Sequence, residues 1–200
     1  MLLHQAAVCQ NWEVAIYPAE IMERLTEPKN NADLRDANAS GTGVSFLCGS
    51  RVTIKLRIDP DSNIVTAGGF TTNGCGYMAA AADTRLDEIA GKPVAELGSL
   101  RAGENYPERR RQCSEVVAEA LRKALADNRQ RIVEEYTGEK ALICTCFGVG
   151  EDTIESVIRK QGANSVDAVS EMCRAGLGCG SCRMLIQEML DDAEATSGAV

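Results

Sequence analysis

The sequence predicts an α+β fold, in which a three-stranded antiparallel sheet with helices is followed by a small all-α domain. Three observations lead to this prediction. Polar and apolar residues alternate strictly over Arg51–Ile58, which is the period of a half-buried strand. Apolar residues recur at helical spacing over residues 107–131. Three short helical segments follow residue 150.

Each element is placed by its own pattern and by the turn residues beside it. Pro28 closes a short amphipathic helix, and the Asp, Pro, Ser and Asn of residues 59–63 form a turn between two strands. The expected elements are, in order, helix 17–27, loop 30–43, strands 43–47, 51–58 and 64–72, helices 77–89, 93–97 and 107–131, linker 134–139, and helices 151–160, 166–172 and 182–190. The chain therefore divides into an extension at 1–16, a first domain at 17–135, a second domain at 141–192 and a flexible tail at 193–200, with fraying expected from Asp191 onward.

Charge and composition restrict the partners. The formal net charge is −8, which argues against a nucleic-acid partner because phosphate binding needs a basic surface. Aromatic residues make up only 4%, which argues against stacking platforms for single-stranded nucleic acid. No apolar run approaches the roughly 18 residues that a membrane span needs. No secretory signal opens the chain, so we expect a cytoplasmic protein whose clustered cysteines bind metal or catalyse. Residues 141–200 carry four Lys and Arg against nine Asp and Glu, which suits docking to a basic partner.

The last third of the chain carries two tight cysteine pairs. Cys144 and Cys146 form a Cys-x-Cys pair, and Cys179 and Cys182 form a Cys-x-x-Cys pair with glycine around it. Each pair places two sulfurs within reach of one metal centre, and four thiolates suit zinc or an iron–sulfur cluster. Cys146 and Cys182 also lie near expected helix starts, where backbone N–H groups would stabilise an anionic site.

Three further cysteines lie where the secondary structure of the first domain is expected to break. Cys48 is between two strands, Cys75 is between the last strand and a helix, and Cys113 is near the start of the long helix. Taken singly, each is better explained as a buried structural cysteine. Glycine beside Cys48 and on both sides of Cys75 favours a ligand role, because glycine leaves space for a bulky group.

An arginine run, residues 109–111, directly precedes the third of these cysteines. Cations at a helix start would lower the pKa of the Cys113 thiol and favour an anionic sulfur. The alternative explanation of the run is a solvated helix face.

These cysteine motifs resemble a known family. Residues 16–135 are similar to the scaffold domain of IscU and NifU proteins in the order and spacing of Tyr17-Pro18, Pro28-Lys29-Asn30, Cys48-Gly49, Gly74-Cys75-Gly76 and Cys113-Ser114. Residues 141–190 resemble the central domain of NifU and bacterioferritin-associated ferredoxin (BFD) in Ile143-Cys144-Thr145-Cys146-Phe147-Gly148-Val149 and Gly178-Cys179-Gly180-Ser181-Cys182. The two halves in this order are the NifU arrangement.

The resemblance implies an IscU/NifU-like first domain, a BFD-like second domain, and a scaffold for iron–sulfur cluster assembly rather than an enzyme. A transient cluster would be held by Cys48, Cys75 and Cys113, with Cys113 as the candidate sulfur acceptor. A permanent [2Fe-2S] cluster for electron delivery would be held by Cys144, Cys146, Cys179 and Cys182. The implied partners are a cysteine desulfurase, apo iron–sulfur client proteins and a second copy in a homodimer. The clients would belong to nitrogen fixation or to general cluster supply.

Two positions depart from the family pattern. Ser50 stands where the family has Asp, a carboxylate thought to help the cluster leave, and Gln112 stands where it has His. The only histidine, His4, is far away in the sequence, so the fourth ligand of the first site would be Ser50, Gln112, water or the other protomer. Cys9 lies in the unpatterned extension, and Cys173 is expected to pack a helix because four other cysteines complete the second site.

Three other functions remain open on the sequence alone. An electron-transfer [2Fe-2S] protein would use only the second site, with the first domain as a docking module, and Ser50 and Gln112 favour it. A structural zinc protein would use the same four thiolates. A dithiol redox protein would use Cys179 and Cys182, although the βαβ pattern typical of that class is missing.

Overall fold

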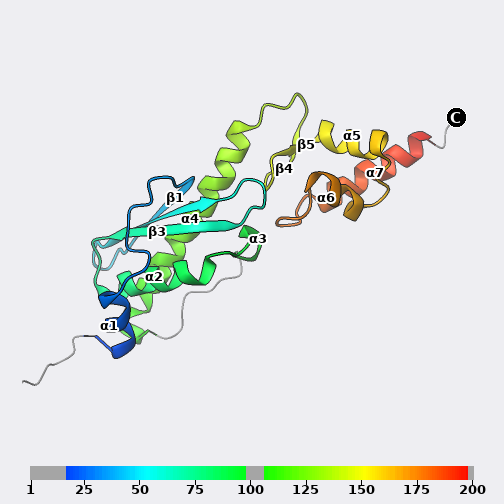
Figure 1. Ribbon diagram of the computed structural model, residues 1–200. Helices are drawn as coiled ribbons and strands as arrows, with labels where there is room; N and C mark the ends of the chain where they lie inside the picture. Colours follow the sequence, from blue (N-terminus) through cyan, green and yellow to red (C-terminus); the bar gives the residue numbers. More distant parts are fainter. Residues whose placement is uncertain (1–16, 98–105, 198–200) are drawn as a thin grey trace, which may run out of the picture.

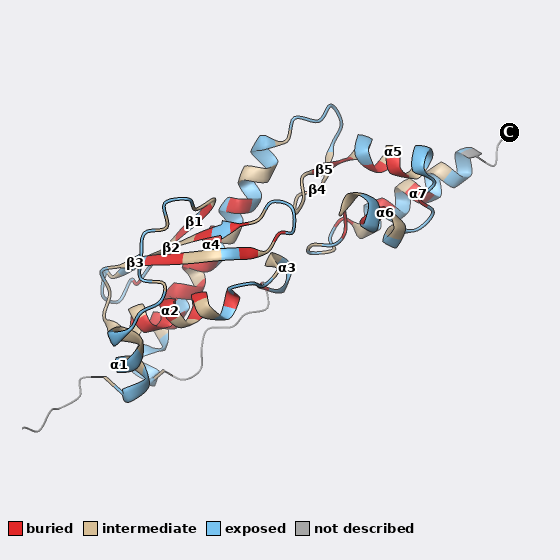
Figure 2. Cartoon of the chain, in the orientation of Figure 1, coloured by how far each residue is buried: buried red, intermediate tan, exposed pale blue. Residues whose placement is uncertain are grey.

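The computed structural model describes residues 17–97 and 106–197 of the chain (Figure 1). The expectations for His4, Cys9 and the extension at 1–16 lie outside the described residues. Two hydrophobic cores form, one in each half of the chain, and they occupy separate parts of an elongated molecule (Figure 2).

The first half contains an antiparallel meander that buries one face. Its strands pair in sequence order and are β1 (Ala39–Val44), β2 (Arg51–Ile58) and β3 (Val65–Thr72). The alternation seen in the sequence of β2 points every second side chain into the core, so that its apolar residues are all buried: Val52, Ile54, Leu56 and Ile58. The sheet is therefore specified by the period-2 pattern of its central strand.

Two helices, α2 (Gly76–Ile89) and α4 (Arg111–Glu135), pack against this sheet. The backbone of α4 approaches β1 so closely that a Cβ on Gly41 would lie 2.2 Å from the carbonyl oxygen of Ala120. Only glycine fits there, which explains why a segment rich in Gly and Ser forms a strand. The loop expected up to residue 43 is therefore wrong from Ala39 onward.

Shorter elements complete the first half: α1 (Ala19–Thr26), α3 (Val94–Leu97) and the 3₁₀ turn η1 (Glu108–Arg110). Buried Asp83 of α2 fastens the segment after α1, since its carboxylate accepts the backbone N–H groups of Lys29 at 2.9 Å and Asn30 at 2.8 Å. The same carboxylate pairs with Arg24 at 3.0 Å. The Pro-Lys-Asn segment thus holds α1 against α2.

The second half is small and mostly helical. Its elements are β4 (Leu142–Cys144), β5 (Val149–Gly150), α5 (Glu151–Gln161), α6 (Val166–Cys173) and α7 (Arg183–Ser197). The two short strands, which pair antiparallel, were not predicted. The helix α7 continues to Ser197, so it extends into the segment where fraying from Asp191 and a flexible tail from residue 193 were predicted. Both predictions concern motion and stay predictions.

The two halves are in contact around Arg174 and around Gly148. Arg174, which follows α6, lies 3.4 Å from the Asp61 carboxylate in the turn between β2 and β3. Its guanidinium also lies 5.5 Å from the centre of the Phe147 ring. Gly148 packs against Ile132 near the end of α4, where a Cβ on the glycine would be 3.5 Å from the isoleucine side chain.

Candidate metal centres

Four of the five cysteines of the second half, Cys144, Cys146, Cys179 and Cys182, meet around one small cavity of about 30 Å³. Cys144 ends β4, Cys146 lies between β4 and β5, and the other two lie between α6 and α7. The Cys146 and Cys179 sulfurs are 3.5 Å apart. Cys144 is hydrogen-bonded to both Cys146 and Cys182. The sulfurs therefore form one continuous chain in the order 182, 144, 146 and 179.

Glycine makes this convergence possible. A Cβ on Gly178 would lie 2.6 Å from the Cβ of Cys146 and 2.8 Å from its sulfur. Gly176 and Gly180 have φ angles of 91° and 76°, which side chains rarely adopt, and they turn the loop back toward β4. The glycines around the second cysteine pair thus position this loop against Cys144 and Cys146.

Backbone N–H groups face the sulfurs, but they come from turns more than from helix starts. Cys144 accepts from the backbone of Gly176, Phe147 and Cys146. Cys182 does lie directly before α7, as expected. Cys146 lies five residues before α5, which begins at Glu151 as expected, and the short strand β5 separates the two. Donors of this kind stabilise anionic sulfur in the way that a helix start would.

The four thiols share their protons unequally. Hydrogen bonding from Cys146 lowers the pKa of Cys144 to about 5 against the effect of burial. The hydrogen bond to Cys144, and then burial, raise the pKa of Cys146. Burial and the neighbouring Cys144 charge raise the pKa of Cys182 to about 11, and the Ser181 hydroxyl lowers the pKa of Cys179. A soft cation that replaced the shared protons would relieve the repulsion between thiolates, so the type of ligand suits an iron–sulfur cluster or zinc. Among the described residues, however, no group of three or more His, Cys, Asp or Glu side chains is arranged around a single ion.

The first cysteine set also converges, at one end of the first half. Cys48 lies in the β1–β2 loop, Cys75 is the N-cap of α2, and Cys113 is in the first turn of α4. Cys113 is hydrogen-bonded to Cys75 and is close enough to Cys48 for their charges to interact. Three elements far apart in the sequence therefore bring three thiols to one place.

These three thiols have different surroundings. Cys48 is exposed, and hydroxyls of Ser45 and Ser50, each 3.3 Å from its sulfur, lower its pKa to about 7, with a smaller effect from Arg110. Cys113 is only 2% exposed, and burial followed by the neighbouring Cys75 raises its pKa to about 12. The expectation that the arginine run lowers the pKa of Cys113 is wrong, because burial outweighs the effect of Arg110.

The glycines around Cys75 have a different role from the one expected. A Cβ on Gly74 would lie 2.6 Å from the sulfur of Met78, and a Cβ on Gly76 would lie 2.6 Å from Leu25. They make room for Met78 of the first core and for Leu25 of α1 rather than for a ligand. Gly76 also donates its N–H to the Tyr17 hydroxyl at 3.1 Å.

Two neighbours of the first site, Ser45 and Tyr77, were not identified from the sequence. Ser45 lies three residues before Cys48, and its hydroxyl is 3.3 Å from the Cys48 sulfur. Arg110 lies 5.5 Å from the centre of the Tyr77 ring, which fixes its charge near the site. The sequence offered one signal for Ser45, which is a hydroxyl three residues from a cysteine in a loop. It offered none for Tyr77, because only the fold brings this ring beside Arg110.

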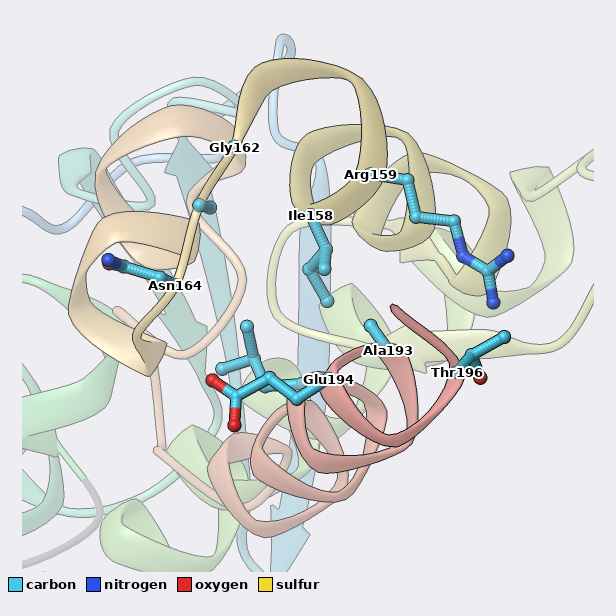
Figure 3. Close-up of a pocket in the computed structure, with 9 residues that line it drawn as sticks. Ile158, Arg159, Gly162, Asn164, Ala193, Glu194 and Thr196 are labelled. Atoms are coloured by element: carbon cyan, nitrogen blue, oxygen red, sulfur yellow. The ribbon is translucent and has the colours of Figure 1, made fainter. Parts of the chain in front are cut away.

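Other features of the described residues are separate from these sites. Cys173 packs against the second core and donates its S–H to the Val169 carbonyl at 3.2 Å, as expected for a packing cysteine. A hollow of about 340 Å³ lies between α5 and α7, where Ile158 and Arg159 face Ala193 and Glu194 (Figure 3). It contains no cysteine. No helix within residues 17–97 and 106–197 has the length and apolar character to cross a membrane.

Comparison with known proteins assigns both halves. Residues 16–135 match the family described as NifU-like N terminal domain. The chain belongs to this family. Residues 142–192 match the BFD-like [2Fe-2S] binding domain, so the NifU-like chain also carries a domain of that kind.

Relatives agree with the assignment. The nitrogen fixation protein NifU of Azospirillum brasilense is 30% identical over 192 residues, which cover 92% of this chain and 62% of the relative. The iron–sulfur cluster assembly scaffold protein IscU of Aquifex aeolicus is 25% identical, over 70% of this chain and 92% of the relative. The chain spans about three fifths of the length of the NifU relatives that it matches. A crystal structure of a NifU-like N-terminal protein from Brucella abortus is 20% identical with a TM-score of 0.49, over 58% of this chain and 96% of that one.

Proposed function

We propose that this chain is a scaffold on which iron–sulfur clusters are assembled before they pass to apo-proteins, and that its second domain holds a permanent [2Fe-2S] cluster. The observation that carries the proposal is the convergence of Cys48, Cys75 and Cys113 from three separate elements, with one of the three sulfurs exposed. The family of the first domain and the scaffold names of its relatives support the same function. The domains on this proposal are residues 17–135 and 141–192.

Each cysteine set has its own role in this proposal. The cluster on the first set is cargo, and the cluster on Cys144, Cys146, Cys179 and Cys182 is resident and supplies electrons. The second-domain loop contributes by holding the sulfurs together and by directing N–H groups, such as that of Gly176, at them. The chain is not an enzyme in the strict sense, because the product stays bound until a client takes it.

The family pattern suggests Cys113 as the sulfur acceptor. Cys48 suits this role better. A thiolate must reach a persulfide on the donor protein, and Cys48 is exposed whereas Cys113 is buried. The Cys48 thiolate would attack the terminal sulfur of the persulfide. The S–S bond of the donor then breaks, the donor thiolate leaves, and Cys48 carries the sulfur as a new persulfide.

The proposed partners are those that the family resemblance implies. The sulfur donor is a cysteine desulfurase, the acceptors are apo iron–sulfur proteins of nitrogen fixation or of general supply, and the working form is a cytoplasmic homodimer. A second candidate function is an electron-transfer protein with a silent first site. The neutral Ser50 hydroxyl beside Cys48, in place of a carboxylate, favours that alternative.

Metal analysis of anaerobically purified protein tests the proposal. Iron, acid-labile sulfide and zinc are measured, with the visible spectrum, before and after incubation with desulfurase, cysteine and ferrous iron. A scaffold shows a stable [2Fe-2S] cluster before incubation and gains further iron and sulfide on incubation. A variant with Cys48, Cys75 and Cys113 all changed to Ala should not show this gain. A stable cluster without an increment indicates the electron-transfer protein, and a colourless zinc protein contradicts both.

A further inference from the structure

Arg174 connects the two cysteine-bearing segments of the second site. It is the C-cap of α6 and begins the loop that carries Cys179 and Cys182. Its guanidinium lies 5.5 Å from the centre of the ring of Phe147, which directly follows Cys146. One side chain therefore bridges the segments of both cysteine pairs.

The backbone of Arg174 adopts a conformation that residues with a long side chain rarely adopt. Its φ is 66°, in the left-handed region. Among the described residues, one other non-glycine residue, Asn63, has a positive φ. Asn63 lies across the junction of the two halves and lines the same cleft as Arg174. Such conformations persist where the surrounding contacts hold them, so both residues indicate that contacts fix the backbone at this junction.

The turn between β2 and β3 presents Asp61 to Arg174 in a fixed position. The Asp59 carboxylate accepts the backbone N–H of Ser62 at 2.8 Å, and the Asp59 carbonyl accepts that of Asn63 at 2.8 Å. The Arg174 guanidinium lies 3.4 Å from the Asp61 carboxylate and also donates to the Asp61 carbonyl. Exposed ion pairs usually contribute little because two side chains must first be ordered. Here the fold already orders both partners.

The rest of the junction is open rather than packed. The two hydrophobic cores share no residue. A cleft of about 290 Å³ separates the β2–β3 turn and the start of α3 from the loop after α6. Domains joined in this way move relative to each other unless specific contacts hold them. Arg174 makes such a contact, and the packing of Ile132 on Gly148 makes another.

We propose that Arg174 and Asp61 form a latch through which the first domain positions the second cysteine site. With the four thiolates joined by a metal, the segments of Cys146 and Cys179 are fixed, and Phe147 then holds Arg174 within reach of Asp61. Linkage makes the effect reciprocal, since a closed latch favours metal binding by the same factor by which metal binding favours closure. Asp61 is thus a positioning residue for a site in the other domain. Of the proposed function, the latch rests only on metal binding by the four thiolates.

Zinc titration of the full chain tests the latch, with the ¹⁵N amide signals of residues 142–192 reporting the second site separately from the first. The zinc affinity of this site is measured by competition with a chelator. Asp61→Asn should weaken it about two- to fivefold, which is the range for one exposed but ordered ion pair, and Asp61→Glu should restore most of it. Asp36→Asn is the matched control and should leave the affinity unchanged, because Asp36 pairs with Arg57 within the first half.

A double-mutant cycle shows whether the two side chains act as a pair. Arg174→Gln removes the ion pair and the guanidinium beside Phe147, so it should weaken zinc binding at least as much as Asp61→Asn does. Adding Asp61→Asn to Arg174→Gln should then have no further effect. Equal affinities in the wild type and Asp61→Asn, or additive effects of the two changes, overturn the proposal, as does a wild type whose second site binds no zinc.

NMR relaxation gives a readout that does not depend on affinity. The correlation times of residues 17–135 and 142–192 should be closer to each other in the zinc-loaded wild type than in zinc-loaded Asp61→Asn or in the metal-free wild type. Asp36→Asn should behave like the wild type. Correlation times that neither zinc nor Asp61→Asn alters contradict the latch. Iron and sulfide uptake is measured separately, so a failed scaffold with a working latch is told apart from a working scaffold without one.

Discussion

Replacing Gly178 by Ala should remove the second metal centre while leaving the first domain folded. A Cβ at this position would lie 2.6 Å from the Cβ of Cys146 and 2.8 Å from its sulfur. Overpacking of this kind costs about 1–3 kcal/mol and is relieved only if Cys146 moves. Metal sites tolerate deviations of roughly 0.2 Å in ligand distances, so the shift displaces one thiolate beyond bonding range.

Gly162→Ala is the matched control in the same domain. Gly162 follows α5 with a φ of 76°, and no atom lies within 4 Å of the position of its Cβ. Ala there costs about 1–2 kcal/mol of backbone strain without touching a sulfur. Gly178 has no positive φ, so its substitution acts by contact alone. The two variants should therefore lose similar stability and differ in metal content.

The assay is iron and acid-labile sulfide per chain after anaerobic purification, together with thermal unfolding followed by circular dichroism. Gly162→Ala should keep the iron and sulfide of the wild type, and Gly178→Ala should lose most of both. Wild-type metal content in Gly178→Ala would refute the reasoning, because the loop would then have room that the structure does not have. Equal losses in both variants would show that general destabilisation, rather than the displaced Cys146, removes the centre.

Three further predictions concern the first domain. Ser50→Asp should make a cluster on the first site more labile in transfer to an apo-acceptor, and equal transfer rates for the two forms contradict this. In the metal-free protein, iodoacetamide should modify Cys48 with a midpoint near pH 7, in line with its pKa of about 7, whereas buried Cys113 should react only on unfolding. Peptide mapping of the labelled protein across pH distinguishes the two cysteines. Labelling of Cys113 in the folded protein would contradict this and show that the site opens. Hydrogen bonding from Arg24 lowers the pKa of Asp87 to about 2, so this carboxylate stabilises the fold above its unfolded pKa of about 3.9 and ceases to do so as the pH falls toward 2. Asp87→Asn should therefore cost about 1–2 kcal/mol at pH 7 and almost nothing near pH 2 in urea titrations, and an equal loss at both pH values would contradict the assignment.

The strand at the centre of the sheet was predictable because its information is local. The alternation over Arg51–Ile58 gives the residues that are buried, and the strand bounds agree with the pattern. β1 was not predictable in this way. Its Ser and Gly residues are typical of a loop, and it becomes a strand because α4, some 80 residues later, requires a surface without side chains at Gly41 and Gly43.

The end of the chain shows the same limit. Polar residues after Leu190 carry no strong helical pattern, yet α7 continues to Ser197. Leu190 is buried against the second core, and Ala193 and Glu194 lie across a hollow from α5. Packing against a neighbouring element extends the helix beyond what its own propensity predicts.

The sequence by itself determined the donor chemistry of this protein. The Cys-x-Cys and Cys-x-x-Cys motifs each supply two sulfurs from neighbouring residues. The number and the chemical softness of the second-site ligands can therefore be read from the sequence. Only the tertiary structure decided what the first three cysteines can do. It exposes Cys48 between two serine hydroxyls and buries Cys113 beneath the start of α4. Burial depends on what packs against a residue from elsewhere in the chain, and for Cys113 it reverses the pKa shift that the adjacent arginines predict.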